Sequence, residues 1–311
     1  MSRLRSAPLT VDSPPEAASA ARISARLVSD LEPGTVTVAF TGSEVDGAGQ
    51  SVTTSILPGM CGRFAVTTDP ALLAEKIKAL DETAETAKQA GPNYNVAPTT
   101  TISTVVKRHT QPEDESTRRI RSMRWGLIPP WAKTTAEGGP ETKGPLLINA
   151  RAETLTTSPA FRGSAKSKRC LVPMDGWYEW RPNPAADGKK ATKTPFYMYA
   201  GDGEPLFMAG LWSTWRPKDA TRDSSPLLSC TIITTDAAAQ LADIHDRMPL
   251  TISAADWDRW MDPDAPIDEG LLRGHGDLDR IQIREVSRLV NSTRNNGPEL
   301  IEAAQPDPGL F

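Results

Sequence analysis

Residues 169–180 read Arg-Cys-Leu-Val-Pro-Met-Asp-Gly-Trp-Tyr-Glu-Trp, and this stretch decides the fold class. Its first four residues are of strand type, with an apolar run after Arg169. Its end also suits a strand, in which Tyr178 and Trp180 would face the core while Trp177 and Glu179 would share the wetter face. No helical period lies between the two segments, so the stretch does not follow the alternating strand–helix rhythm of a parallel sheet.

Short strands of this kind recur along the chain. The strand-like runs lie at 61–66, 101–106, 119–125, 195–200, 205–212 and 228–234, separated by polar loops at 107–118, 133–144, 182–194 and 216–226. Helices are expected from Asp69-Pro70 onward, at 236–244 and at 253–261, where Ser253 and Asp256 would form the N-terminal cap. The pattern predicts a single α+β domain with a mostly antiparallel, barrel-like β core and a few flanking helices.

The composition divides the chain at residue 60. Of the 8 Trp, 4 Tyr and 6 Phe among 311 residues, only Phe40 lies in residues 1–59, a segment that also lacks Lys. A segment with so little to bury cannot easily offset its ordering entropy. We expect residues 1–59 to be a poorly ordered extension, with a start of translation at Met60 as one explanation, and residues 60–311 to be the catalytic domain.

Several classes of protein are excluded by the same composition. The apolar runs are far shorter than the ~20 residues of a membrane span, so no membrane partner is expected. The 3 Cys and 3 His lack the spacing of a zinc site or a disulfide framework, so neither a metal nor another cofactor is predicted. The net charge of −4 argues against non-specific coating of nucleic acid and leaves room for a local basic groove. A cytoplasmic monomer is expected.

Cys61 is the first candidate for chemistry, in Met60-Cys61-Gly62-Arg63-Phe64. An internal Cys beside Gly is usually a buried filler. If the chain began at Met60 and methionine were removed, Cys61 would carry a thiol and a free α-amine. Such an aminothiol condenses with an aldehyde to an imine, which the thiol closes to a thiazolidine, and both groups have reference pKa values of about 8.

Three further residues have settings that suit acid–base or polar chemistry. Glu179 lies among aromatic side chains whose desolvation would raise its pKa, although an ordinary strand position is equally compatible. His245 lies beside Asp243, Asp246 and Arg247 at a helix end, a setting for a proton shuttle, although a lone His is more often structural. Asn149 suits a helix N-cap by local rules and could alternatively orient a substrate oxygen.

Two rigid loops could contact unpaired bases. Residues 124–131 read Arg-Trp-Gly-Leu-Ile-Pro-Pro-Trp, in which an exposed Trp would be either a stacking platform or part of a core turn. Residues 93–98 read Asn-Tyr-Asn-Val-Ala-Pro and leave the same two interpretations open. Arg151 could pair with Glu153 or bind a phosphate.

The order of these blocks resembles the SOS-response-associated peptidase (SRAP) family of abasic-site processing proteins. The resemblance covers about residues 60–302 and rests on the blocks above, together with Gly176-Trp177-Tyr178-Glu179-Trp180 and Ile244-His245-Asp246-Arg247-Met248-Pro249. It implies a protein that binds single-stranded DNA and crosslinks to an abasic site through an N-terminal Cys, here Cys61, acting in the DNA damage response near the nucleoid. The family is also described as a peptidase that removes the residues ahead of its Cys.

The resemblance also implies roles for individual residues. Asn149 would orient the opened sugar, Glu179 would transfer protons during imine formation, and His245 would move protons in ring opening and in reversal of the crosslink. The DNA contacts would be Arg63, Asn95, Pro98, Trp125, Gly126, Leu127, Arg151, Trp180 and Arg247. Asn93 stands where the family often has Arg, so one basic contact is expected to be missing.

Two alternatives to a DNA-crosslinking enzyme stay open on the sequence. One is a thiol peptidase or amidohydrolase that uses Cys61 as an acyl nucleophile without DNA. The other is a non-enzymatic module that binds single strands through its Trp and Arg residues.

Overall fold

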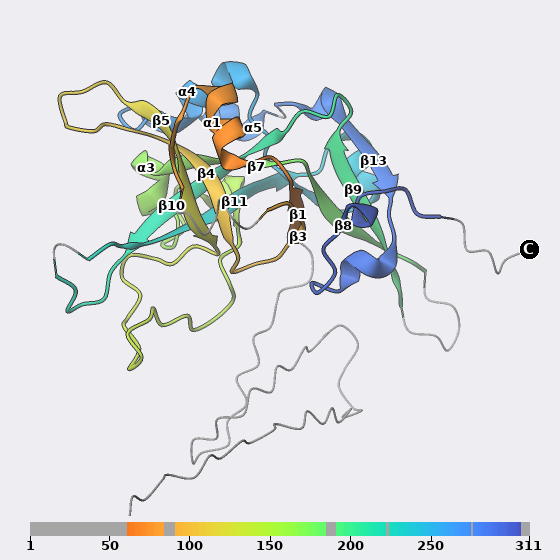
Figure 1. The fold of residues 1–311 in the computed structure, drawn as a ribbon, viewed down its shortest axis with the longest axis horizontal. Helices are drawn as coiled ribbons and strands as arrows, with labels where there is room; N and C mark the ends of the chain where they lie inside the picture. The colour runs from red at the N-terminus through yellow and green to blue at the C-terminus, as the bar shows by residue number, and fades with distance from the viewer. Residues whose placement is uncertain (1–60, 84–90, 185–190, 222–223, 275, 306–311) are drawn as a thin grey trace, which may run out of the picture. The chain divides into compact units, whose positions relative to one another are not determined.

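The computed structural model describes residues 61–83, 91–184, 191–221, 224–274 and 276–305, drawn as the coloured ribbon in Figure 1. The extension expected at residues 1–59 lies outside these described residues. Within them, no helix is long and apolar enough to cross a bilayer.

A five-stranded barrel forms the centre of the fold. Its strands are β4 (Thr101–Arg108), β5 (Thr117–Trp125), β7 (Arg169–Met174), β10 (Leu206–Trp215) and β11 (Leu227–Asp236). They are hydrogen-bonded in the order β11-β10-β7-β4-β5, and β5 pairs back onto β11 to close the ring. The closing pair is parallel and the other four are antiparallel, which confirms the predicted mostly antiparallel, barrel-like core.

A second sheet lies beside the barrel and begins immediately after Cys61. Its order is β13 (Ile281–Glu285), β9 (Lys193–Ala200), β8 (Gly176–Pro182), β1 (Arg63–Val66) and β3 (Asn93–Val96), with every pair antiparallel. β8 follows β7 directly, so the chain passes from one sheet to the other at Asp175. This crossing joins the barrel to the sheet that carries Glu179.

The two sheets share one apolar core. Phe64 of β1 and Trp125 of β5 pack edge to face with ring centroids 5.0 Å apart, and both belong to the same buried cluster as Trp177. Gly176 permits close packing of β8 on β9, because a Cβ at this position would lie 2.3 Å from the carbonyl oxygen of Met198. Aromatic burial of this size dominates the energetics of such an interface.

The strand that carries Glu179 is buried on both faces. Trp177 lies in the core between the sheets, and Tyr178 lies in a second cluster with Tyr197. Glu179 itself is only 4% exposed. The predicted division into a dry face and a wetter face is therefore wrong, since the barrel covers one face while other segments, including Val290, cover the opposite one.

Of the three helices expected in the described part of the chain, one begins as predicted and two are shorter than predicted. α1 (Pro70–Ile77) begins as predicted, with the Asp69 carboxylate accepting hydrogen bonds from two backbone amides. The segment expected at 236–244 forms only a 3-10 turn at Ala239–Asp243. The segment at 253–261 begins as a 3-10 turn and continues as α4 (Trp257–Met261), and the Ser253 hydroxyl bonds the Asp256 carboxylate instead of capping the backbone.

The remaining elements are short and lie around the two sheets. The short strands are β2 (Leu80–Glu82), parallel to β5, and β6 (Asn149–Arg151) and β12 (Arg247–Pro249), which both pair with β11. The other helices are α3 (Arg162–Ser167) and α5 (Glu269–Arg273), with 3-10 turns at Ala152–Thr154, Leu278–Arg280, Arg288–Asn291 and Pro298–Leu300.

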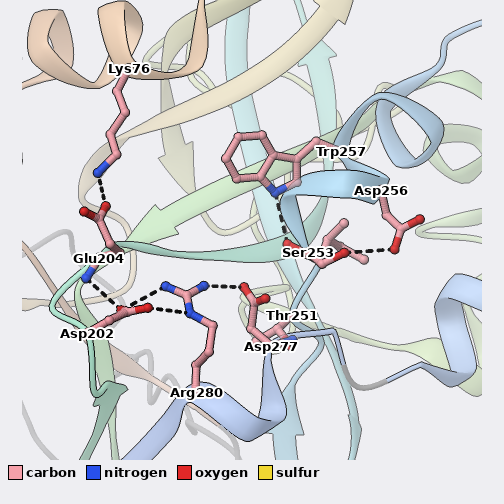
Figure 2. Close-up of polar contacts among 10 residues, drawn as sticks. Lys76, Asp202, Glu204, Thr251, Ser253, Asp256, Trp257, Asp277 and Arg280 are labelled. Atoms are coloured by element: carbon pink, nitrogen blue, oxygen red, sulfur yellow. Dashed lines mark hydrogen bonds and ion pairs between the residues drawn. The ribbon is translucent and has the colours of Figure 1, made fainter.

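Ion pairs tie three peripheral segments together, as Figure 2 shows. Lys76 of α1 contacts Glu204 in the β9–β10 connection, and Arg280 makes a two-point contact with Asp202 of the same connection at 2.9 and 3.0 Å. Arg280 also donates to Asp277 at 2.8 Å. The Lys76–Glu204 and Arg280–Asp202 pairs lie at the surface, so each stabilises the fold by no more than about 1 kcal/mol.

Candidate functional site

Cys61 lies two residues before β1 and is 1% exposed. Its backbone carbonyl accepts a hydrogen bond of 3.0 Å from the side-chain amide of Asn149. Asn149 is itself buried, on β6, where it pairs with Ile232 of the barrel strand β11. The barrel therefore holds the backbone of Cys61 through one amide.

Asn149 does not cap a helix. It is the first residue of β6, and the residue in the cap position of the following 3-10 turn is Arg151. The N-cap predicted by local rules is therefore wrong, because pairing with β11 overrides the local preference. The side-chain Oδ1 of Asn149 is buried without a hydrogen-bond partner among the described residues, so one acceptor stays available at the site.

Burial raises the pKa of the Cys61 thiol well above its usual value, and the negative charge of Glu179 raises it further. The thiol is therefore protonated at neutral pH in this closed arrangement. β1 and β8 are paired with Arg63 opposite Tyr178, so Cys61 and Glu179 lie at the same end of this strand pair.

Burial also raises the pKa of Glu179, to about 8, with a smaller contribution from the negative charge of Asp246. Its Oε1 is buried without a hydrogen-bond partner among the described residues. A carboxyl group with this pKa holds its proton near pH 7 and can both give and take one. This agrees with the desolvation predicted from its aromatic neighbours.

His245 precedes β12, and its ring is largely buried at 14% side-chain exposure. Its Nδ1 lies 3.0 Å from the backbone N of Arg247 and 3.0 Å from Oδ1 of Asp246. The Arg247 amide donates to this nitrogen, and the Asp246 carboxylate lies beside it. The ring is therefore held in place by its own loop.

Arg247 is held by its own neighbours. Its guanidinium contacts both carboxylate oxygens of Glu153 at 2.8 and 3.0 Å, the carboxylate of Asp236 and the carbonyl of Thr234. It is 8% exposed, and its side chain lowers the pKa of Glu153. The resemblance implies that Arg247 contacts a phosphate or sugar of DNA, whereas in the structure its charge fixes the segment that carries His245.

Arg63 and Asn95 are similarly engaged. The guanidinium of Arg63 donates to Oδ1 of Asn95 at 2.8 Å and to the backbone carbonyls of Val290 and Asn291. The side-chain amide of Asn95 donates to three carbonyls of the same 290–295 segment. Trp180 joins this group through a bond from Nε1 to the side chain of Asn291 at 2.7 Å. These three residues, predicted to bind DNA, anchor a C-terminal segment.

Trp125 is fully buried, so a stacking platform at this position is wrong and the core turn is the alternative that the structure adopts. Its Nε1 donates to the carbonyl of Ile148 at 3.0 Å, and Leu127 is also buried at 2% exposure. Between them Gly126 adopts a φ of +115°, which favours glycine. The exposed aromatic of this loop is Trp131, at 60% exposure, which the motif pattern did not single out.

Two predicted contacts remain open to solvent. Arg151 is exposed, and no side-chain hydrogen bond or ion pair engages it within the described part of the chain. Pro98 is partly exposed beside Thr99, whose backbone amide bonds the carbonyl of Trp125. Arg151 follows Asn149 by two residues on β6, so a solvent-facing cation lies close to the buried site.

The four residues predicted to be catalytic come from separate parts of the chain. Cys61 is bonded to Asn149 and electrostatically coupled to Glu179. Glu179 is in turn coupled to Asp246, which lies against the His245 ring. In the sequence Asp246 is only a neighbour of His245, and its effect on Glu179 becomes visible only in three dimensions.

Comparison with known proteins identifies the family of this chain. The family profile of SOS response associated peptidase (SRAP) matches residues 60–293. Abasic site processing protein YoqW of Bacillus subtilis is 38% identical over 247 residues, which cover 78% of this chain and all of YoqW. Abasic site processing protein YedK of Escherichia coli is 34% identical over 250 residues, covering 78% of this chain and 99% of YedK.

Solved structures share the fold at lower identity. A protein of Bacteroides thetaiotaomicron superposes with a TM-score of 0.62 at 23% identity, covering 79% of this chain and 100% of its own. A protein of Bordetella bronchiseptica gives a TM-score of 0.54 at 23% identity, covering 73% of this chain and 100% of its own. The profile match over most of the chain and the full-length relatives place this protein in the SOS response associated peptidase (SRAP) family.

Proposed function

We propose that this protein processes abasic sites by binding single-stranded DNA and bonding the opened sugar to Cys61. The observation that carries the proposal is the grouping of Cys61 with Asn149 and a Glu179 that holds its proton near neutral pH. The substrate is inferred from the relatives, which are named abasic site processing proteins.

The chemistry needs the α-amine of Cys61 to be free. The ring-opened abasic sugar presents an aldehyde, whose carbon the amine attacks to give a carbinolamine. Loss of one water gives an imine, and the Cys61 sulfur then adds to the imine carbon while its proton passes to nitrogen. The product is a thiazolidine, formed with the net release of one water and no oxidant or cofactor.

Glu179 is suited to the proton transfers of this sequence. In its protonated form it can donate to the departing carbinolamine oxygen, and as a carboxylate it can take the thiol proton that burial otherwise retains. His245 would assist opening of the sugar, since its imidazole is a group suited to proton transfer and its Nδ1 is held by the Arg247 amide and the Asp246 carboxylate. Asn149 would keep the Cys61 backbone in position and offer its unpaired Oδ1 to the sugar.

In the 311-residue chain, Met60 acylates the nitrogen of Cys61. The proposal therefore requires a form in which Cys61 is the first residue. Either translation begins at Met60 and methionine is removed, which we favour, or the chain is cleaved before Cys61. The start of the family match at residue 60 supports a functional unit that begins there.

A test of the proposal compares two forms of the protein with the same abasic single strand. The form that begins at Cys61 should give an adduct that survives denaturation, and the form that retains residue 60 should give none. Cys61→Ala should abolish the adduct, while Cys170→Ala, which changes a buried barrel Cys, should retain it. An adduct that persists in Cys61→Ala would point to a lysine Schiff base and would contradict the proposal.

A second candidate is peptide cleavage before Cys61. It is favoured by the family description as a peptidase and by the position of the Cys61 thiol next to Glu179. The sulfur would attack the carbonyl carbon of Met60, the peptide nitrogen would leave as the free amine of Cys61, and water would hydrolyse the thioester. Intact-mass analysis of the purified full chain over time should then show loss of residues 1–60, and Cys61→Ala should stay intact.

The non-enzymatic alternative makes a different prediction in the first test. A module that only binds single strands would retain strands with and without the aldehyde equally, and high salt would release both. Covalent capture limited to the abasic strand, and independent of any added reductant, would exclude it.

A further inference from the structure

A cluster of cations closes one end of the barrel, at the end of β4 and the beginning of β5. The inner face of β5 runs Arg119, Arg121, Met123 and Trp125, because alternate residues of a strand share a face. Met123 and Trp125 are buried in the core that reaches Phe64, while Arg121 is 37% exposed at the opposite end. Arg121 and Trp125 are four residues apart, or about 14 Å along the strand.

Arg108 and Lys168 complete this cluster, which we call the basic end of the barrel: Arg108, Arg119, Arg121 and Lys168. The guanidinium of Arg108 lies 5.0 Å from the ring centre of Trp212 on β10, and the ammonium of Lys168 lies 5.3 Å from the same ring. The indole therefore holds two cations at the rim through its π face.

The cations are close enough to repel one another. Burial lowers the pKa of Arg108, and the positive charges of Arg121 and Arg119 lower it further. Burial and the charge of Arg108 lower the pKa of Lys168. The carboxylate of Glu82 offsets part of this charge, since it pairs with Arg119 and lies 3.5 Å from Arg121.

The cluster also contains an unused donor. Nε of Arg119 is buried without a hydrogen-bond partner in the described part of the chain. Glu82 contacts two of the four cations and acts on a third, Arg108, in a protein whose net charge is −4. Positive charge is therefore concentrated at this end of the barrel, although the whole chain is negative. Such a concentration favours an anion from outside the chain.

The chemistry of the anion follows from the donors and their spacing. Three of the four cations are guanidinium groups, which match phosphate oxygens in a two-point geometry. Glu82 already bridges Arg119 and Arg121 on β5, while no carboxylate of the described residues pairs with Arg108 or Lys168 beside Trp212. The cations are therefore spread over the end of β4, the start of β5 and the residue before β7, and a row of phosphates fits this spread better than a single phosphate.

We propose that the basic end of the barrel binds the phosphate backbone of a nucleic-acid segment at a place separate from the Cys61 site. Figure 1 agrees with the separation, since the β4–β5 loop and the label of β8 lie on opposite sides of the view. The inference rests on the proposed function only for the presence of DNA. Binding at this end needs neither the aldehyde nor the free amine of Cys61.

The test measures binding of the full chain to a long unmodified single strand between ~50 and ~200 mM salt. The double variant Arg108→Gln/Arg121→Gln should bind several-fold more weakly at low salt. Affinity decreases with salt, and the plot of log affinity against log salt should be less steep for the double variant. Its slope should be smaller in magnitude by about 0.7 for each phosphate that the variant no longer neutralises. Arg273→Gln, which changes an exposed helical Arg paired with Glu269, is the matched control and should keep the wild-type slope.

Two further measurements separate this proposal from the chemistry at Cys61. The double variant, prepared in the form that begins at Cys61, should crosslink a short abasic strand at the wild-type rate. The same fall in slope should appear when the double change is made in Cys61→Ala, so failure of the crosslinking proposal would leave this result intact. Thermal unfolding of the double variant checks that the barrel is retained.

A wild-type salt slope in the double variant would overturn the proposal. An equal fall in Arg273→Gln would overturn it as well, because the effect would then be one of net charge. Inorganic phosphate could stabilise the wild type but not the double variant, while the two proteins bind the strand with equal affinity. The site would then take a free anion, and the nucleic-acid proposal would be wrong.

Discussion

The side-chain amide of Asn149 donates a 3.0 Å hydrogen bond to the backbone carbonyl of Cys61. This bond joins residues 88 positions apart and connects the barrel with the start of the second sheet. It fixes the backbone of Cys61 directly to a strand that is paired with the barrel. The position of the thiol and of its nitrogen therefore depends on β6.

Replacing Asn149 tests this dependence. Asn149→Asp keeps the shape of the side chain but turns a carboxylate oxygen toward the Cys61 carbonyl, so we expect a loss of stability of about 1–3 kcal/mol. Adduct formation by the form that begins at Cys61 should slow at least ~10-fold, because the amine is no longer positioned. Asn183→Asp, which changes the partly exposed Asn that follows β8, should alter the rate and the unfolding midpoint much less. Equal effects at both positions would contradict the role given to Asn149.

Glu179 gives the protein a defined dependence of stability on pH. Its pKa in the folded state is about 8 and lies near 4.5 in the unfolded chain, so the folded state binds the extra proton between these values. Stability should therefore fall as pH rises from about 5 to 8, by a few kcal/mol, since one pKa unit corresponds to about 1.4 kcal/mol. Urea unfolding of Glu179→Gln should show a flatter profile across this range.

The matched control for this experiment is Glu269→Gln, which changes an exposed carboxylate of α5. Its profile should follow that of the wild type. A wild-type stability that rises between pH 5 and pH 8, with no difference from Glu179→Gln, would show that Glu179 is ionised in the folded protein. Its assignment as the proton donor would then be wrong.

Arg247 should act through the structure around His245. Arg247→Ala removes the contacts to Glu153, Asp236 and the carbonyl of Thr234, and we expect a loss of about 2 kcal/mol. Arg273→Ala, which breaks an exposed pair, should cost less than about 0.5 kcal/mol. Thermal unfolding compares the two, and similar small costs would show that Arg247 is free for another role.

Replacing each tryptophan of the 124–131 loop should distinguish a residue needed for stability from one available for binding. Trp125→Ala should lower the unfolding free energy by about 3–5 kcal/mol, because the side chain is fully buried against Phe64. Trp131→Ala should change stability by less than about 0.5 kcal/mol, since its ring is 60% exposed. Fluorescence titration measures the affinity of Trp131→Ala for a single strand. A loss of affinity would identify Trp131 as the stacking residue expected in this loop.

The strands and their class could be predicted from the sequence because local alternation reports them. The closure of the barrel could not be predicted from the sequence, because it joins segments about a hundred residues apart. In this closing contact β5 and β11 run parallel, with Arg124 and Trp125 opposite Ser229 and Cys230. The same non-local pairing explains the error at Asn149. Its local surroundings suit a cap, and only the contact with β11 turns it into a strand residue.

The sequence selects candidates for catalysis by residue type, but it does not show which residues reach solvent. Residue type and motif order select Cys61, Glu179 and His245, whose chemistry does not depend on exposure. Whether an Arg or Trp reaches solvent depends on what covers it. Arg63 and Trp180 are engaged by the segment around Asn291, more than a hundred residues further along the chain, which no local pattern predicts.

Mass spectrometry of the form that begins at Cys61, after incubation with an abasic single strand, tests the central claim most directly. The account predicts a species that survives denaturation, with the summed mass of protein and strand less one water, and with the modification on Cys61. A species of unchanged protein mass, or an equal adduct on the form in which Met60 still acylates Cys61, would contradict it.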